Sequence, residues 1–319
     1  MKKRYIIIAM VLAMAMTTVG GATVFAADEK AEGNDYTIAY VPTTMNNPFW
    51  TAMMGGIKEE MEAKGMDVDK QLVTVDANSD QATMNNYVND LIAQQVDAII
   101  LAPMDCTAVT EALTACEEAG IPVINVDTAV DATDKVVSII ASDNYKAGVE
   151  CAEDMMSKLD KGAKIAVMNQ PSGTACVQRE KGFLDTAGDY FEIVSTTDTE
   201  GDTAKTMTAA EDVLTADDDL AGFFCINDMG ALGCVQAAQA AGKEDLLIYG
   251  VDGNPDFMGY VADGSATASA AQQPSVIGQK ALDAAIDTLD GKEVEHDQVV
   301  DVVLINKDNI ADFDVTDWQ

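Results

Sequence analysis

Short apolar segments rich in β-branched residues alternate with longer segments of helical periodicity from residue 36 to the end of the chain. Many of the apolar segments lack interspersed polar residues, which is typical of strands that helices cover on both faces of a parallel sheet. The alternation therefore predicts an α/β fold, and about 290 residues are enough for two such units. The predicted strands are residues 36–41, 68–75, 98–101, 123–126, 136–140, 164–168, 191–196, 222–226, 247–251, 266–270 and 299–305.

Capping residues mark the ends of several predicted helices. Pro48 fits the first turn of a helix that Gly65 ends. The N-caps expected for three other helices are Asp80, Thr107 and Asp202. The glycines that follow helical stretches, as C′ residues do, are Gly120, Gly188, Gly242 and Gly291.

The charge balance excludes some classes of partner. The chain has 54 Asp and Glu residues against 19 Lys and Arg residues, a formal net charge of -35. Proteins that bind nucleic acids or anionic membranes neutralise phosphate with basic side chains, so neither partner is expected. With 48% hydrophobic residues, the chain has enough apolar mass for packed domains rather than intrinsic disorder.

The N-terminal segment predicts export. Lys2, Lys3 and Arg4 precede an apolar run, and small residues follow up to Ala27. The run of about 12 residues is short for a membrane span and typical of a secretory signal. We expect residues 1–26 to be a signal peptide and 27–35 a flexible lead-in, with the mature protein in the periplasm or the extracellular space. An uncleaved membrane anchor is the alternative.

Polar and aromatic side chains follow the ends of several predicted strands. In open parallel sheets, ligands bind beyond the carboxyl ends of the strands, so residues from both halves of the chain could converge on one cleft. Arg179 lies early in the helix after strand 164–168. The other residues of this set are Thr43, Asn46, Asn47, Phe49, Trp50, Asp127, Thr128, Asn227, Asp228, Asp252 and Gln272.

The set combines planar hydrogen-bonding groups with an aromatic pair. Carboxylates accept hydrogen bonds from vicinal hydroxyls and a guanidinium donates to them, while an aromatic plane covers the C–H face of a sugar ring. The set therefore suits a sugar or a polyol. Individual members also have structural alternatives, which are helix capping for Asn46, Asp127 and Asp228 and core packing for Phe49 and Trp50.

Seven short segments together carry a family resemblance. They are NNPFW at 46–50, IPVINVD at 121–127, ASDN at 141–144, REKGF at 179–183, NDMGALG at 227–233, GVDG at 250–253 and AQQP at 271–274. In this order they resemble the sugar-binding group of type I periplasmic solute-binding proteins, and its ribose-binding branch most of all. The resemblance extends over nearly all of the chain from residue 36.

The resemblance implies two Rossmann-like lobes with parallel sheets, joined by a three-segment hinge and closing around a sugar. The first lobe is expected to comprise residues 36–142 plus 273–301, and the second residues 143–272 plus 302–319. The chain is expected to cross between the lobes at the hinge residues Ser142, Asp143, Gln273 and Asp301.

The resemblance also implies a function and a binding site. The function is that of a substrate-binding protein of an ABC importer, a monomer without cofactor or metal that delivers a monosaccharide to permease subunits. A chemoreceptor is a further compatible partner. The implied ligand-binding residues are Asn47, Phe49, Trp50, Asp127, Arg179, Asn227, Asp252 and Gln272, with Thr43 and Thr128 as weaker contacts.

Two departures from the ribose-binding pattern affect the choice of sugar. Thr128 stands where that pattern has an arginine, so a charged fork-like donor is lost. The aromatic residue expected on the second lobe is replaced around Glu200 and Gly201. We therefore expect a pentose, a hexose or a related polyol, and ribose itself does not follow from the sequence.

Two other classes of protein compete with a binding protein. An exported hydrolase could use Asp127 and Asp252 as paired carboxylates. The single histidine, His296, lies in a polar stretch and is expected to be solvated. The six cysteines form no CxxC pair and are expected as small buried hydrophobic residues, with a disulfide as the alternative. A sugar-responsive repressor would need a DNA-binding segment where this chain has its export signal.

Overall fold

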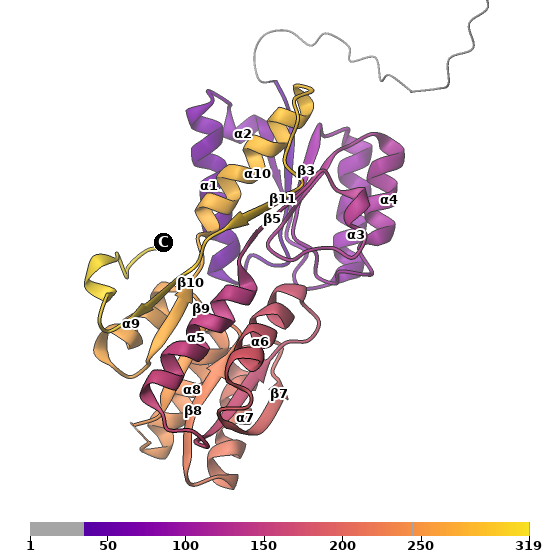
Figure 1. Cartoon of the computed structure of the whole chain (residues 1–319). Coiled ribbons are helices and arrows are strands. Elements are labelled where there is room, and N and C mark those ends of the chain that lie inside the picture. Colours follow the sequence, from indigo (N-terminus) through magenta and orange to yellow (C-terminus); the bar gives the residue numbers. More distant parts are fainter. Residues whose placement is uncertain (1–34, 244, 319) are drawn as a thin grey trace, which may run out of the picture. The chain divides into compact units, whose positions relative to one another are not determined.

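The computed structural model describes residues 35–243 and 245–318, which form two six-stranded sheets with helices on both faces of each (Figure 1). The α/β fold predicted from the sequence is confirmed. The expected signal peptide at 1–26 and nearly all of the expected lead-in lie outside the described residues. Within the described part, no helix is both long and apolar enough to span a bilayer.

The first sheet is parallel throughout, with the strand order β11-β5-β4-β3-β1-β2. Its strands are β1 (Ile38–Val41), β2 (Leu72–Thr74), β3 (Ala98–Leu101), β4 (Val123–Val126), β5 (Ser138–Ser142) and β11 (Asp297–Val300). Each face of this sheet has its own hydrophobic core. One core includes α1 (Pro48–Ala63) and α10 (Pro274–Leu289), and the other includes α3 (Gln81–Gln94) and α4 (Thr110–Ala119).

The second sheet has the order β12-β10-β9-β8-β6-β7, and only β12 runs antiparallel to its neighbour. Its strands are β6 (Lys164–Asn169), β7 (Glu192–Asp198), β8 (Leu220–Cys225), β9 (Leu247–Asp252), β10 (Ala268–Ala271) and β12 (Val303–Asn306). One core includes α5 (Asn144–Lys158) and α6 (Thr174–Ala187). The other includes α7 (Thr203–Ala216), α8 (Asp228–Ala241) and α9 (Pro255–Asp263).

The chain crosses between the two sheets three times, after β5, after β10 and after β11. The crossing segments bond to one another. The backbone N–H of Asp143 donates to the carbonyl of Val300 over 3.0 Å, and Gln273 Nε2 donates to the carbonyl of Asp301 over 3.0 Å. These residues lie where the sequence places the hinge, and a hinge motion there stays a prediction.

The end of the chain returns to the helix layer of the first sheet. Residues Phe313 and Val315 pack on the core of the second sheet, as expected for a segment assigned to the second lobe. Trp318, in contrast, packs on the core of the first sheet, with its ring 5.7 Å from that of Phe49. The assignment of residues 302–319 to the second lobe alone therefore does not describe the contacts of Trp318.

Four local predictions differ from the structure. Residues predicted as strand at 68–75 begin with a short helix, α2 (Val68–Gln71), because the polar residues of that turn favour it over an apolar strand. The last predicted strand divides into β11 and β12, one in each sheet. The N–H groups before α4 are capped by Asp105 rather than Thr107, and Gly188 has φ of -61° instead of a left-handed conformation. Strands β3 and β4, and the caps Asp80 and Asp202, agree with prediction.

Two glycines allow α5 and α6 to pack closely, and this contact places Arg179. A Cβ atom on Gly148 of α5 would lie 2.0 Å from the carbonyl oxygen of Arg179, and one on Gly182 would lie 2.1 Å from that of Tyr145. Only glycine permits this approach. The N-terminal half of α6 is thereby held against the start of α5.

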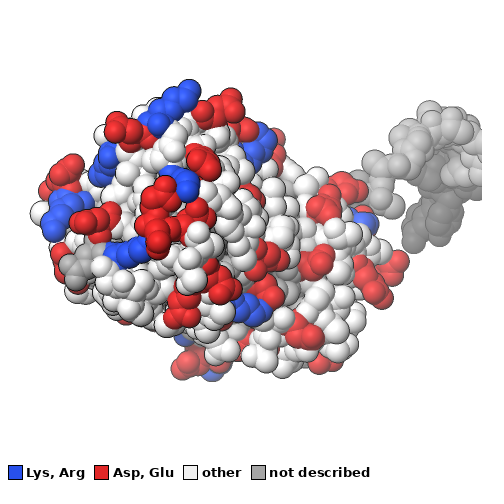
Figure 2. Space-filling view, turned by 90° about the horizontal axis from the view of Figure 1, so that it is seen from below, with Lys and Arg blue, Asp and Glu red and all other residues white. Residues whose placement is uncertain are grey.

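The acidic surplus is dispersed over the face that Figure 2 shows, with fewer basic side chains between the acidic ones. Several exposed charges of the molecule form surface pairs, such as Lys205 with Glu200 at 2.6 Å. Exposed pairs of this kind contribute about 0–1 kcal/mol each. The net charge of this face therefore favours the solubility of the protein and contributes little to the stability of the fold.

Candidate ligand-binding site

A pocket of about 570 Å³ lies at the carboxyl ends of both sheets. Its wall comes from the loops and helix starts that follow β1, β2, β3, β4, β6, β7, β8, β9 and β10. The structure places all ten predicted binding residues in this wall, namely Thr43, Asn47, Phe49, Trp50, Asp127, Thr128, Arg179, Asn227, Asp252 and Gln272. Their contact with a ligand remains a prediction.

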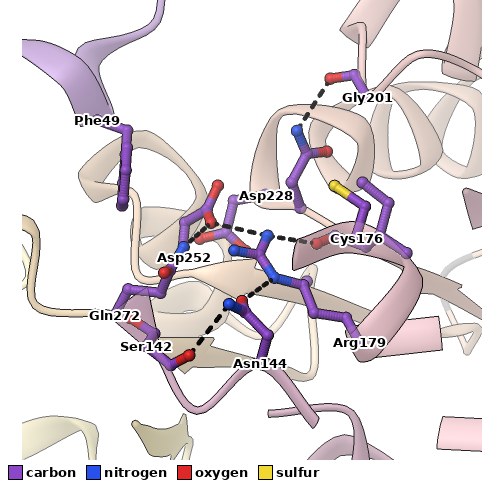
Figure 3. A network of polar contacts seen from close by, with 12 residues as sticks. Phe49, Ser142, Asn144, Cys176, Arg179, Gly201, Asp228, Asp252 and Gln272 are labelled. Carbon is purple, nitrogen blue, oxygen red and sulfur yellow. Dashed lines mark hydrogen bonds and ion pairs between the residues drawn. The ribbon is translucent and has the colours of Figure 1, made fainter. Parts of the chain in front are cut away.

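Arg179 lies at the centre of a buried polar network (Figure 3). Its Nε donates to Asn144 Oδ1 over 2.7 Å, and its Nη1 donates to the carbonyl of Ile226 over 2.8 Å. Nη1 also lies 3.2 Å from Asp252 Oδ1. These contacts fix the orientation of the guanidinium, and a donor that is held in place lowers the entropic cost of binding.

Asp252 ends β9 in an unusual backbone conformation, with φ of 140°. Gln272 Nε2 donates to its Oδ1 over 2.6 Å. Burial raises the pKa of Asp252 to about 6, although the charge of Arg179 opposes this shift. The carboxylate is therefore held in place and poorly solvated.

Asp228 lies close to Asp252 (Figure 3), and the sequence placed it among the residues that could converge on the cleft, with helix capping as the alternative. It is fully buried, and it accepts hydrogen bonds from Ser269 Oγ over 2.8 Å and from the backbone N–H of Asn254 over 2.7 Å. The N–H of Gly253 donates to the same Ser269 hydroxyl over 3.0 Å. Asp228 therefore supports the turn that presents Asp252. Burial, and next the charge of Asp252, raise the pKa of Asp228 well above its ordinary value.

Asp127 follows β4 with a left-handed φ of 61°. Its Oδ2 accepts a hydrogen bond from the Thr128 hydroxyl over 2.8 Å. The amide of buried Asn125 holds the same loop, since its Nδ2 donates to the carbonyl of Thr128 and its Oδ1 accepts from the N–H of Val130. Burial raises the pKa of Asp127, while the charge of Arg179 lowers it.

The aromatic pair lies on the first turn of α1. Asn47 caps this helix, and its Oδ1 accepts from the N–H of Phe49 over 3.0 Å. The rings of Phe49 and Trp50 meet edge to face at 5.0 Å, and both belong to the core as well as to the pocket wall. Phe49 and Trp50 therefore both pack in the core and line the pocket. The helix cap is Asn47 rather than Asn46.

The wall opposite the aromatic pair is polar and includes Gln170, Ser172, Glu200, Gly201 and Lys205. Among the described lining residues, the aromatic ones are Phe49 and Trp50 alone. Gly201 has φ of 63°, and its carbonyl accepts from Asn227 Nδ2 over 3.1 Å. A Cβ at this position would lie only 2.6 Å from that nitrogen, so the wall is shaped around glycine.

One hydrogen bond joins the two halves of the molecule beside the pocket. Thr174 Oγ1, at the start of α6, donates to the carbonyl of Ala129 over 3.1 Å. Thr174 Oγ1 also lies 3.8 Å from Cys106 Sγ. This contact connects the helix that carries Arg179 to the loop that carries Asp127.

The single histidine and the six cysteines are further groups with possible catalytic or metal-binding chemistry. His296 contacts the carbonyl of Thr133 and is not in the pocket wall, and its hydrogen bond with Asp297 raises its pKa. Within the described residues, no group of three His, Cys, Asp or Glu side chains is placed to hold a metal ion. The six cysteines are free thiols, with the Sγ atoms of Cys225 and Cys234 3.4 Å apart.

Residues outside the predicted set complete the network. Asn144, Asp228 and Ser269 fix Arg179 and Asp252, and Cys176 lines the pocket. Asn144 falls within the ASDN segment and Asp228 directly follows Asn227. Both therefore carried a signal in the sequence, whereas Ser269 lies inside an apolar strand with no such signal.

Comparison with known proteins agrees with this architecture. A family model described as "Periplasmic binding protein domain" matches residues 38–293. The ribose import binding protein of Bacillus subtilis is 36% identical over 262 residues, covering 82% of this chain and 84% of the relative. A crystal structure of an ABC transporter solute-binding protein from Agrobacterium vitis with bound D-fucose has 31% identity and a TM-score of 0.80, covering 86% of this chain and 96% of that one.

A second solved structure has the same fold. This periplasmic solute-binding protein from Actinobacillus succinogenes, with bound D-allose, is 26% identical with a TM-score of 0.81 and covers 87% of this chain and 100% of that one. The family match and the relative from Bacillus subtilis each span most of the chain. The chain therefore belongs to the periplasmic binding protein family.

Proposed function

We propose that this protein is the substrate-binding subunit of an ABC importer and that it binds a monosaccharide or a related polyol. The observation that carries the proposal is the pocket at the carboxyl ends of both sheets, where an aromatic pair faces buried Arg179 and Asp252. The relatives and neighbours named above bind ribose, D-fucose or D-allose according to their names. Their shared chemistry is a ring bearing several hydroxyl groups.

The lining side chains supply the two kinds of contact that such a ring needs. Asp127 and Asp252 accept hydrogen bonds from hydroxyls, Arg179 donates, and Asn227 and Gln272 can donate or accept. Hydrogen bonds to charged groups contribute about 1.5–3 kcal/mol each. Two or three of them, with the ring covered by Phe49 and Trp50, are enough for a micromolar dissociation constant, about -8 kcal/mol.

Binding would act through closure of the two lobes on the ligand. The first lobe contributes Phe49 and Asp127, and the second contributes Arg179 and Asp252, so a sugar between them favours the state in which they face each other. The crossings at Asp143, Gln273 and Asp301 are the hinge. The closed, loaded form would be the one that the permease recognises.

The same proposal covers location and chemistry. Membership of the family supports an exported protein, whose signal peptide would be residues 1–26 and whose mature form acts as a monomer. The protein catalyses no reaction in this proposal, because Asp127 and Asp252 serve as hydrogen-bond acceptors. The identity of the sugar stays open, since Thr128 and Gly201 replace two features of the ribose-binding pattern.

A thermal-shift screen tests the proposal. The purified mature protein is melted with each of a panel of pentoses, hexoses and polyols, and in parallel with Asp252→Asn. A ligand at 100 times its dissociation constant stabilises the folded protein by about 2.7 kcal/mol. We expect at least one carbohydrate to raise the melting temperature of the wild type and not that of Asp252→Asn. A panel without any shift would refute carbohydrate binding, and turnover of the sugar would refute a purely binding role.

A further inference from the structure

Asp127 carries a buried carboxylate oxygen that lacks a partner. The residue is 7% exposed and lines the pocket. Its Oδ2 is bonded to the Thr128 hydroxyl, whereas no residue of the described structure donates a hydrogen bond to Oδ1. Leaving a buried charged acceptor unpaired is costly, so this oxygen is suited to accept a hydrogen bond from a donor on the ligand.

Neither basic side chain of the pocket wall forms a hydrogen bond with Asp127. Arg179 donates to Asn144, to the carbonyl of Ile226 and to Asp252. Lys205 is exposed and pairs with Glu200 at 2.6 Å. Residue 128, next to Asp127, is a threonine whose hydroxyl is already used by Oδ2. The charge of Arg179 reaches Asp127 through space, but no hydrogen bond joins the two.

The pocket wall is acidic as a whole. Its basic side chains are Arg179 and Lys205, and its acidic side chains are Asp127, Asp198, Glu200, Asp202 and Asp252. Two side-chain atoms of the wall are buried and unpaired, Asp127 Oδ1 and Gln272 Oε1, and both are acceptors. These two buried atoms therefore need donors from the ligand, and the wall carries more acidic than basic side chains.

An ammonium group supplies what is missing. It carries three donors and no acceptor, whereas a hydroxyl brings lone pairs that need donors of their own. Either group makes a charge-assisted hydrogen bond to a carboxylate, but only the ammonium group also carries the opposite charge, and that attraction is stronger away from water. A ligand with an amino group in place of one hydroxyl would therefore gain most at Asp127.

We propose that the pocket takes an amino sugar or an amino-substituted polyol, with the ammonium group bound at Asp127 Oδ1. This inference rests on the proposed carbohydrate-binding function and narrows its ligand class. The sugar hydroxyls and ring would bind to Arg179, Asp252 and the aromatic pair as for a neutral sugar. Thr128, in place of a basic residue, is then the substitution that makes room for the cation of the ligand.

Matched pairs of ligands test this class by calorimetry at pH 7. The pairs are D-glucosamine with D-glucose, D-galactosamine with D-galactose, and an inosamine with myo-inositol, and the N-acetyl sugars serve as probes that keep the nitrogen without its charge. We expect the amine of at least one pair to bind at least tenfold more tightly than both its hydroxyl and its N-acetyl counterpart.

Three variants locate the effect. Asp127→Asn keeps the shape of the side chain and should reduce the preference for the amine to less than twofold. Thr128→Arg places a cation beside Asp127 and should reduce it similarly. Asp134→Asn removes an exposed carboxylate that lies outside the pocket wall and should leave the preference at least tenfold. Melting curves verify that each variant is folded.

The outcomes separate this inference from the function on which it rests. Neutral sugars that bind as tightly as their amines, or a preference for amines that survives Asp127→Asn, would overturn the inference and leave carbohydrate binding intact. If neither the pairs nor any other carbohydrate of the thermal-shift panel binds, the proposed function fails and this inference falls with it.

Discussion

Arg179 Nη1 and Asp252 Oδ1 lie 3.2 Å apart, and both side chains are almost completely buried in the second lobe. The pair is present without a ligand, and Asn144 and Gln272 hold its two members from either side. The binding wall and the core of this lobe are therefore the same structure. Substitutions in the pair must affect stability as well as binding.

Arg179→Ala is expected to abolish sugar binding and to destabilise the protein. Removing one partner of a buried ion pair leaves an uncompensated charge and typically costs about 3–5 kcal/mol. Urea denaturation measures the loss, and calorimetry measures binding. Lys181→Ala is the matched control on α6, because Lys181 forms an exposed pair with Asp185 and should change stability by less than about 0.5 kcal/mol. Equal stability of the two variants would contradict the account.

The stability of the ligand-free protein should fall as the pH rises through 6. Burial raises the pKa of Asp252 to about 6, so the folded state holds a proton that the unfolded chain releases near pH 4. The free energy of unfolding should therefore decrease by about 1–3 kcal/mol between pH 4.5 and 7. The raised pKa values of Asp127 and Asp228 act in the same direction.

Asp252→Asn isolates this contribution. The variant should show a distinctly flatter profile of melting temperature against pH over the same range. Asp134→Asn is the matched control, because Asp134 is exposed and lies outside the pocket wall. A profile that rises from pH 4.5 to 7, or one that Asp252→Asn leaves unchanged, would show that the buried carboxyl does not titrate there.

Thr174→Val should weaken ligand binding without affecting the unliganded fold. The hydroxyl of Thr174 donates to the carbonyl of Ala129 across the two lobes, and a hydrogen bond of this kind contributes about 0.5–1.5 kcal/mol. We expect affinity to fall by about three- to tenfold, mainly through faster dissociation. Thr186→Val is the control, since the Thr186 hydroxyl bonds to Gly182 within the same helix. Similar affinities for the two variants would show that the contact does not support closure.

Trp318→Ala should weaken the packing that holds Phe49 in the pocket wall. The ring of Trp318 packs edge to face on Phe49, and such pairs contribute about 0.5–1.5 kcal/mol beyond the area that they bury. A modest loss of stability and a few-fold loss of affinity are expected, and Trp318→Phe should restore most of both. If removal of the indole has no effect on either quantity, the end of the chain has no part in ordering Phe49.

The predictable part of the fold was local in the sequence. Strands β3 and β4 agree with prediction because each is a fully buried run of four residues that is apolar except for Asn125. The segment at 299–305 also looked like one strand, but the chain leaves one sheet and joins the other within it. Which sheet a short strand joins depends on distant partners, and local patterning contains no information about them.

The site was predictable for the same kind of reason. Strand ends bring their following residues to one edge of a parallel sheet, so Asp127 and Asp252 were expected to meet in one cleft. The residues that support Asp127 and Asp252 could not be predicted in this way, because their roles depend on how the fold packs. In the sequence, Ser269 is only a small polar residue within a strand. Its role follows from the fold, which places its hydroxyl 2.8 Å from Asp228. Trp318 likewise has a role only through its contact with Phe49.

Calorimetric titration of the mature protein with the carbohydrate that gives the largest thermal shift tests the central claim most directly. The account predicts one ligand per chain, a dissociation constant in the micromolar range or below, and no measurable heat of binding with Asp252→Asn. The absence of saturable heat with any carbohydrate, or undiminished binding by Asp252→Asn, would contradict it.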